Sequence, residues 1–237
     1  MFKILLWTFT LNLFFKFIIQ NSSNYNSTAL FIVSRYLLIA FILFVWYKLK
    51  KNRFDYNVLK SKKWLIFSIV LIVICFSIVT KETNQLLVNQ YYLLLLECLS
   101  VGFLEELLFR YIVFDYFLIK TKKYKVSIVL ASLIFALFHI SNLFSGSSIY
   151  STINQIEFAF IIGLVLQFIF IKTKNLIIIS TIHALINFLG THSGLTRHIE
   201  IKEITFNDFI MNQLFILVIY LMVVPIYFWR LKYDRLD

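Results

Sequence analysis

Three charged residues lie close together in a segment that is otherwise apolar enough to cross a membrane: Glu105, Glu106 and Arg110. Even the lowest estimates assign about 2.5 to 3.5 kcal/mol to one ionised side chain at the centre of a membrane-spanning helix. Charges in such a place are therefore a functional-site hypothesis by default. A carboxylate beside an imidazole is a suitable general base for activating water, so histidines at the same depth would complete the site.

Two later apolar segments supply those histidines. Phe135 and His139 are four residues apart on one of them, and His183 and Asn187 are four residues apart on the other. Side chains at this spacing share one face of a helix, so each pair can face a common cavity. The sequence therefore predicts one polar site built from three helices.

The two adjacent glutamates are expected to have different roles. Glu106 and Arg110 are also four residues apart, which predicts a buried structural ion pair between them. Glu105 is rotated from Glu106 by about 100° around the helix axis, so it is left to point into the cavity beside the histidines. A charge network that only locks helices together is the alternative interpretation of these residues.

Depth in the membrane supports a shared cavity. At about 1.5 Å of rise per helical residue, Glu105 lies roughly 20 Å from the outer end of its segment, and His139 lies roughly 20 Å from the cytoplasmic end of its own. On the same scale His183 and Asn187 lie roughly 12 and 18 Å from the cytoplasmic end of theirs. Polar groups on three helices are thus expected at comparable depth.

Composition assigns the chain to integral membrane proteins. Its 237 residues are 60% hydrophobic and only 15% charged, and the mean hydropathy is +0.83. This leaves too little polar surface to coat a water-soluble globule. Long helices with short loops are expected, because backbone groups in lipid must be paired within the chain and only five glycines and one proline are present. The net charge of +11 is assigned to short loops that contact lipid headgroups, so no nucleic-acid partner is expected.

The predicted fold is an all-α, polytopic membrane helix bundle. Apolar windows of about 17 to 25 residues give eight candidate spans, at 4–20, 29–47, 64–79, 91–118, 126–144, 153–171, 175–190 and 209–229. The positive-inside rule places the segments rich in lysine and arginine, and with them both termini, in the cytoplasm. These segments are 48–63, 120–125, 172–174 and 230–235.

The domain organisation is expected to be simple. No internal repeat is visible, so residues 1–237 are interpreted as a single integral membrane domain, with a catalytic core at 91–190 that carries the polar motifs. Cys75 and Cys98 fall inside apolar segments and match no paired-cysteine motif, which argues against a disulfide framework or a thiolate metal site. We expect a multi-pass protein of the cell membrane.

The three polar patterns together, in this order on separate apolar helices, resemble the CPBP family. That family comprises the type II CAAX prenyl endopeptidases and the bacterial membrane proteins of bacteriocin processing and immunity, known as Abi proteins. The residues that carry the resemblance are Glu105, Glu106 and Arg110 in E-E-x-x-x-R, Phe135 and His139 in F-x-x-x-H, and His183 and Asn187 in H-x-x-x-N.

The resemblance implies an intramembrane protease of eight helices and a role for each motif residue. Glu105 and His139 would activate a water molecule, and His183 and Asn187 would stabilise the oxyanion. An imidazole and a side-chain amide are suitable donors to developing negative charge. Three further residues would support the site from behind, and these are Glu106, Arg110 and Phe135.

No cofactor is expected, but a metal is the alternative. Two histidines and a carboxylate, here His139, His183 and Glu105, could hold Zn²⁺ with one position open. The sequence contains no H-E-x-x-H pair, and the metal-free interpretation is favoured.

The predicted function is hydrolysis of a peptide bond in a membrane-associated peptide, with the peptide and the lipid bilayer as partners. The small size and a composition rich in Lys, Asn, Ile and Phe are typical of a bacterial protein, which favours bacteriocin or signal-peptide maturation or self-immunity. The first alternative is a non-catalytic immunity or scaffold protein of the same fold. A transporter that uses the charged triplet as an ion relay is the second, although Gly- or Pro-broken helices, common in transporters, are missing.

Overall fold

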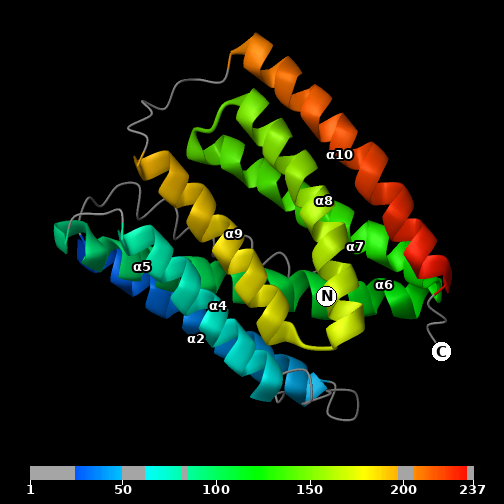
Figure 1. Ribbon diagram of the computed structural model, residues 1–237. Helices are drawn as coiled ribbons and strands as arrows, with labels where there is room; N and C mark the ends of the chain where they lie inside the picture. Colours follow the sequence, from blue (N-terminus) through cyan, green and yellow to red (C-terminus); the bar gives the residue numbers. More distant parts are fainter. Residues whose placement is uncertain (1–24, 50–61, 82–84, 197–204, 234–237) are drawn as a thin grey trace. The chain divides into compact units, whose positions relative to one another are not determined.

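The computed structural model describes residues 25–49, 62–81, 85–196 and 205–233. Within these ranges the chain is almost entirely helical and contains no strand, which confirms the predicted all-α class. The elements are α2 (Tyr25–Leu49), α4 (Lys62–Lys81), α5 (Gln85–Glu106), the π-helix η1 (Leu107–Val113), α6 (Phe114–Thr121), α7 (Tyr124–Phe138), the 3₁₀-helix η2 (His139–Ser145), α8 (Ile149–Thr173), α9 (Leu176–Thr196) and α10 (Phe206–Tyr233) (Figure 1).

These helices fall where long apolar runs predicted membrane spans. The first predicted span, 4–20, lies outside the described residues, and each of the others coincides with one helix or with consecutive helical elements. Two segments are long and apolar enough to cross a membrane by length and composition, Tyr124–Phe144 and Ile149–Thr173. Shorter apolar helices occur at Ile32–Phe44, Leu65–Ile78, Leu176–Gly190 and Phe206–Met222. Eight spans and cytoplasmic termini stay predictions.

The described helices form two compact units. The first, called the α5–α9 unit, contains α2, α4, α5 and α9. The second, called the α7–α8 unit, contains α6, α7, η2 and α10, together with most of η1 and of α8. The chain passes from one unit to the other within η1, between Leu108 and Phe109, and again near the end of α8.

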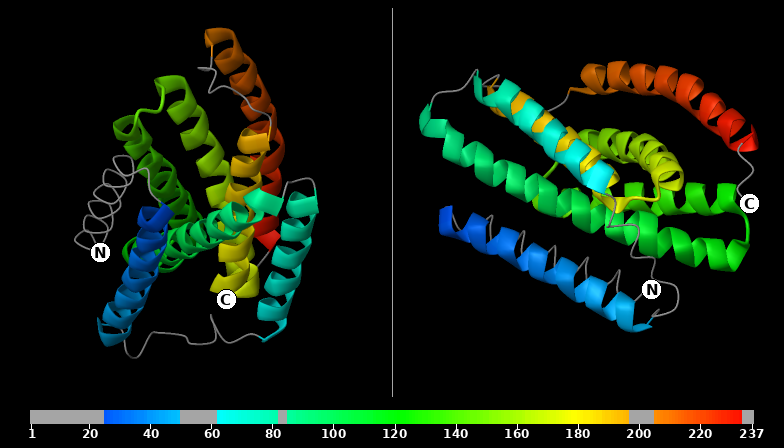
Figure 2. Two further views of the ribbon diagram at one scale, coloured as in Figure 1. Left: turned by 90° about the vertical axis from the view of Figure 1, so that its left-hand side faces the viewer. Right: turned by 60° about the horizontal axis from the view of Figure 1, so that its bottom comes forward.

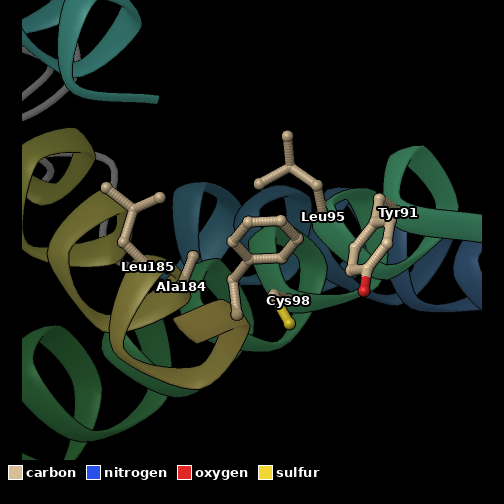
Figure 3. Packing of buried hydrophobic residues seen from close by; sticks show 6 residues of the cluster. Tyr91, Leu95, Cys98, Ala184 and Leu185 are labelled. Carbon is tan, nitrogen blue, oxygen red and sulfur yellow. The ribbon is translucent and has the colours of Figure 1, made fainter. Parts of the chain in front are cut away.

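In the α5–α9 unit, α9 packs against α5 and α4, and α2 packs against α5 (Figure 2). A buried cluster joins α5 to α9 and consists of Tyr91, Leu95, Cys98, Ala184, Leu185 and Phe188 (Figure 3). The ring of Phe188 lies 6.4 Å from that of Tyr91 and 6.2 Å from that of Phe76 on α4. These contacts fix the register of the two helices that carry the glutamates and His183.

In the α7–α8 unit, short turns and one close helix contact set the geometry. Lys122 adopts a left-handed conformation with φ of 53° and ends α6, which allows α7 to begin two residues later and pack against α6. Gly146, with φ of 84°, ends η2 in the same way. A Cβ added to Gly163 on α8 would lie 3.1 Å from Cβ of Ser132, so α7 and α8 pack closely at this point.

Candidate functional site

His183 on α9 lies between the two glutamates that end α5. Its Nδ1 is 2.8 Å from Oε1 of Glu106, and its Nε2 is 3.6 Å from Oε2 of Glu105. The side chain of Glu106 is fully buried, that of His183 is 6% exposed, and that of Glu105 is 18% exposed. Because an ionised carboxylate only accepts hydrogen bonds, the Nδ1–H of His183 donates to Glu106. The Nε2 atom is left facing Glu105.

The close approach of α5 and α9 at Gly102 brings these side chains together. A Cβ at this position would lie 2.7 Å from the backbone oxygen of Ser180 and 2.9 Å from the backbone nitrogen of Ala184. Only glycine allows backbones to come this near, as small residues do at helix interfaces in membranes. Glu105 follows Gly102 by about one turn, and His183 precedes Ala184, so the contact sets the carboxylates opposite the imidazole.

The charged triplet spans a change of helix type. Glu105 and Glu106 are the last residues of α5, whereas Arg110 lies within the π-helix η1. A π-turn pairs residues five apart, so the α-helical spacing argument that linked Glu106 to Arg110 does not apply across this junction. The contact found for Glu106 is with His183, and the Arg110 pair stays a prediction. Single π-turns of this kind are frequent at functional sites.

Phe135 organises the motif residues of the α7–α8 unit. Its ring lies 4.6 Å from Cζ of Arg110, a cation–π contact, and 5.1 Å from the ring of Phe109. The ring of His139 lies 5.2 Å away at 89°, an edge-on arrangement. Phe135 and Arg110 are buried. The prediction that Phe135 supports the pocket stays open, but its contacts with two other motif residues favour it.

His139 is the first residue of η2, where α7 changes into a 3₁₀-helix. Its Nδ1 lies 3.2 Å from the backbone oxygen of Phe135, one turn earlier. A carbonyl oxygen accepts, so Nδ1 carries the hydrogen, and in the neutral imidazole the lone pair then lies on Nε2. An imidazole held in this tautomer can take a proton from water through Nε2.

The predicted site residues therefore form two groups. In the α5–α9 unit, Glu105, Glu106 and His183 are in contact, and Asn187 lies half-buried on α9 one turn after His183. In the α7–α8 unit the second group is formed by Arg110, Phe135 and His139. Glu105 belongs to the first group and His139 to the second. Their joint action on one water molecule stays a prediction.

Glu105 and His183 have the donor chemistry and spacing for two ligands of one zinc ion. Ligands bound tetrahedrally at about 2.1 Å lie roughly 3.4 Å apart, close to the 3.6 Å between Oε2 of Glu105 and Nε2 of His183. Glu106 would then orient the imidazole from its other nitrogen, as outer-shell carboxylates do. No group of three or more His, Cys, Asp or Glu side chains arranged to hold a metal is found among the described residues. The zinc alternative stays a prediction.

Two features of the site were not predicted from the sequence. Gly102 was not singled out, although a glycine three residues before a glutamate in an apolar helix is a recognisable signal of close packing. The double contact of His183 was also missed, because Glu106 was assigned to Arg110. The sequence signal for this double contact was the comparable membrane depth predicted for the two glutamates and His183.

The contact of buried carboxylate and imidazole side chains on apolar helices brings together the residue types that acid–base chemistry uses. In a comparison with family models, residues 87–189 match the Rce1-like family, described as type II CAAX prenyl endopeptidase Rce1-like. This segment contains every motif residue, and the predicted CPBP resemblance is confirmed. The family is a membrane-embedded protease family, which supports a peptidase. Comparisons with curated proteins and with solved structures gave no match.

Proposed function

We propose that this protein is an intramembrane endopeptidase that hydrolyses a peptide bond of a membrane-associated peptide. The observation that carries the proposal is the pair of carboxylates on either side of His183, within a segment that matches a protease family. The protein would be a multi-pass component of the cell membrane, and its peptide substrate would reach the site within the bilayer.

The proposed reaction begins with a water molecule activated by Glu105 and His139. Nε2 of His139 or the Glu105 carboxylate takes a proton from the water, whose oxygen attacks the scissile carbonyl carbon. A tetrahedral intermediate forms with negative charge on the former carbonyl oxygen. The same base then returns the proton to the peptide nitrogen as the carbon–nitrogen bond breaks, which releases an amine and a carboxylic acid.

His183 and Asn187 are proposed to stabilise the oxyanion. Nε2 of His183 lies 3.6 Å from Oε2 of Glu105, on the side of the ring where we place the substrate oxygen. A ring with a hydrogen on each nitrogen donates through Nδ1 to Glu106 and through Nε2 to the developing negative charge. Removing one donor of this kind typically lowers kcat by about 10²- to 10³-fold.

The test is cleavage of membrane peptides by purified protein in liposomes. Wild type is compared with Glu105→Gln and His139→Ala, and with Asp208→Asn, an exposed carboxylate at the start of α10, as the control. General acid–base residues contribute about 10²- to 10⁴-fold, so we expect losses of this size in the first two variants and near-normal activity in the control. Full activity in Glu105→Gln would refute the proposed mechanism.

A chelator distinguishes the two proposed ways of activating water. We expect activity to survive in chelator if Glu105 and His139 act without a metal. Loss of activity that added zinc restores would instead support the zinc alternative, with Glu105, His139 and His183 as ligands.

The biological role is proposed to be maturation of a secreted peptide, such as a bacteriocin or a signal peptide, or self-immunity against one. Two forms of this role are distinguished by exposing cells that express either wild type or Glu105→Gln to a peptide toxin and comparing their survival. Protection by wild type alone supports a protease. Equal protection by both proteins would favour the non-catalytic immunity or scaffold function.

A further inference from the structure

A second polar cluster lies in the α7–α8 unit, away from the motif residues. Nε2 of Gln213 on α10 donates to Oε2 of Glu157 on α8 at 2.6 Å and to Oδ1 of Asn154 at 3.0 Å. The hydroxyl of Tyr220 donates to the backbone oxygen of Glu157 at 3.5 Å. We call Asn154, Glu157 and Gln213 the Glu157 cluster.

Glu157 is a charged residue in an apolar setting. It lies in Ile149–Thr173, one of the helices long and apolar enough to cross a membrane. Its carboxylate accepts a hydrogen bond from the neutral amide of Gln213, and the hydroxyl of Tyr220 donates to its backbone oxygen. A carboxylate in such a helix is a functional-site hypothesis by default, because desolvation makes it costly to keep.

The cluster has unused capacity for binding. Nδ2 of Asn154 is buried and has no hydrogen-bond partner among the described residues. Buried polar groups are normally paired, so this amide is suited to donate to a further acceptor. Glu157 is only half-buried, which leaves its carboxylate within reach of a ligand. The Glu157 carboxylate can pair with a cationic side chain, and the Asn154 amide can donate a hydrogen bond to the backbone carbonyl of the same residue.

Hydrogen bonds connect the cluster to the segment that begins with His139. Asn142 lies three residues after His139 in η2, about 6 Å along a 3₁₀-helix. Nδ2 of Asn142 donates to Oε1 of Gln155 at 2.5 Å, and Gln155 is next to Asn154 on α8. The turn of α8 that carries Glu157 is therefore tied to the proposed catalytic histidine within one unit of the structure.

We propose that the Glu157 cluster is a binding subsite for a cationic side chain, lysine or arginine, of the peptide substrate. The ammonium or guanidinium group binds the Glu157 carboxylate, and Asn154 donates to a nearby backbone carbonyl of the peptide. An extended peptide advances about 3.3 Å per residue, so moving the cationic residue by one position shifts its charge by about that distance. This inference rests on the proposed function, because it assigns specificity to that reaction.

The test measures binding separately from cleavage. The probes are apolar peptides of about 20 residues, long enough to span a bilayer, each with a single lysine at one of successive positions. Every lysine peptide is matched by one with norleucine at that position, which is neutral and of similar length. Binding to the full-length protein in lipid nanodiscs is measured with Glu105→Gln, so that cleavage does not interfere, and with Glu105→Gln combined with Glu157→Gln.

With Glu157 intact, we expect lysine at the favoured position to tighten binding by at least about tenfold over norleucine, an effect of the size of one charge-assisted contact. Glu157→Gln keeps an acceptor for Gln213 but removes the charge, so the preference should disappear while norleucine peptides bind as before. Asp208→Asn, an acidic residue at the start of the same helix α10, serves as the control and should keep the preference.

Three outcomes would overturn the inference. One is equal binding of lysine and norleucine peptides at every position with Glu157 intact. Another is equal weakening of both peptides by Glu157→Gln together with a lower Tm, which would make the cluster only a bridge between α8 and α10. The third is cleavage by wild type with no charge preference. A lysine preference without any cleavage would instead refute the proposed reaction and leave the binding subsite standing.

Discussion

At the scale of single residues, the orientation of His183 depends on Glu106. The carboxylate is fully buried and accepts the Nδ1–H at 2.8 Å, which fixes the ring so that Nε2 faces Glu105. Glu106→Gln keeps an oxygen acceptor but loses the charge, whereas Glu106→Leu removes both. Outer-shell partners of this kind are typically worth about 10- to 100-fold, so we expect losses near tenfold for glutamine and near 100-fold for leucine.

The measurement is kcat and KM of each Glu106 variant on one peptide in liposomes. A loss confined to kcat indicates that the orientation of His183 matters in the transition state rather than for binding. Glu106→Leu also leaves a buried imidazole donor without its partner, which costs about 1–3 kcal/mol and should lower Tm. Wild-type kinetics for both variants would refute the assignment.

Phe135 is the residue that we expect to support the second motif group. Phe135→Leu keeps most of the apolar volume but removes the ring that contacts Arg110, His139 and Phe109. Cation–π and aromatic pairs contribute about 0.5–2 kcal/mol each, so thermal unfolding should show a loss on the order of 1–3 kcal/mol. Phe144→Leu is the control, because Phe144 is 76% exposed and should change little. Equal stability of the two variants would contradict a supporting role.

Residue type, spacing and depth selected Glu105, Glu106 and His183, and the structure places these three side chains in contact, whereas the sequence did not predict how they pair. Their pairing depends on the side of α5 that meets α9, and one-dimensional spacing does not contain this information. An imidazole also has two nitrogens, so both adjacent glutamates can contact one histidine.

At the scale of helices, the contact of α5 with α9 at Gly102 sets the geometry of the site. Gly102→Ala places a Cβ within 3 Å of backbone atoms of Ser180 and Ala184, which cannot move independently of α9. Overpacking of this kind costs about 1–3 kcal/mol and should displace His183 from the carboxylates, lowering Tm and activity together. Gly190→Ala on α9, the helix that Gly102 contacts, is the control, because its added Cβ meets nothing within 4 Å.

Helix propensity makes this comparison sharp. Alanine is favoured over glycine in a helix interior by about 0.8–1 kcal/mol, so Gly190→Ala should be neutral or slightly stabilising. Thermal unfolding in nanodiscs and the cleavage rate are measured for both variants. A stabilised and active Gly102→Ala protein would show that α5 and α9 are not packed as closely as described.

The helices themselves were predictable, whereas their irregular turns were not. Apolar runs located the described elements, because burial in lipid requires continuous hydrophobic segments with internal backbone pairing. The predicted span 91–118 is divided by the π-helix Leu107–Val113, and 126–144 changes into a 3₁₀-helix at His139. Hydropathy is insensitive to which carbonyl an N–H pairs with, so it cannot locate such changes. Both changes fall on motif residues.

At the scale of the whole chain, exposed apolar faces indicate contact with lipid. On α10, Phe215 and Leu221 are 67% and 68% exposed, and on α4 Ile66 is 61% exposed. Such faces would be an aggregation hazard in water but match the hydrocarbon of a bilayer. They agree with the membrane-embedded character of the family. The excess of lysine and arginine in some loops predicts which side of the membrane each loop lies on, and the helices alone do not give this information.

The direction of α7 through the membrane can be tested at its two ends. Lys122 precedes α7 in a loop predicted to be cytoplasmic. Ser147 follows η2 at the other end of the predicted span 126–144, which the same topology places outside, and both residues are exposed. Lys122→Cys and Ser147→Cys are made separately in a background where Cys75 and Cys98 are replaced by alanine. A membrane-impermeant maleimide should label the Ser147→Cys protein in intact cells, and the Lys122→Cys protein only after permeabilisation. The opposite pattern would invert the predicted topology, and labelling of both in intact cells would show that α7 does not cross the bilayer.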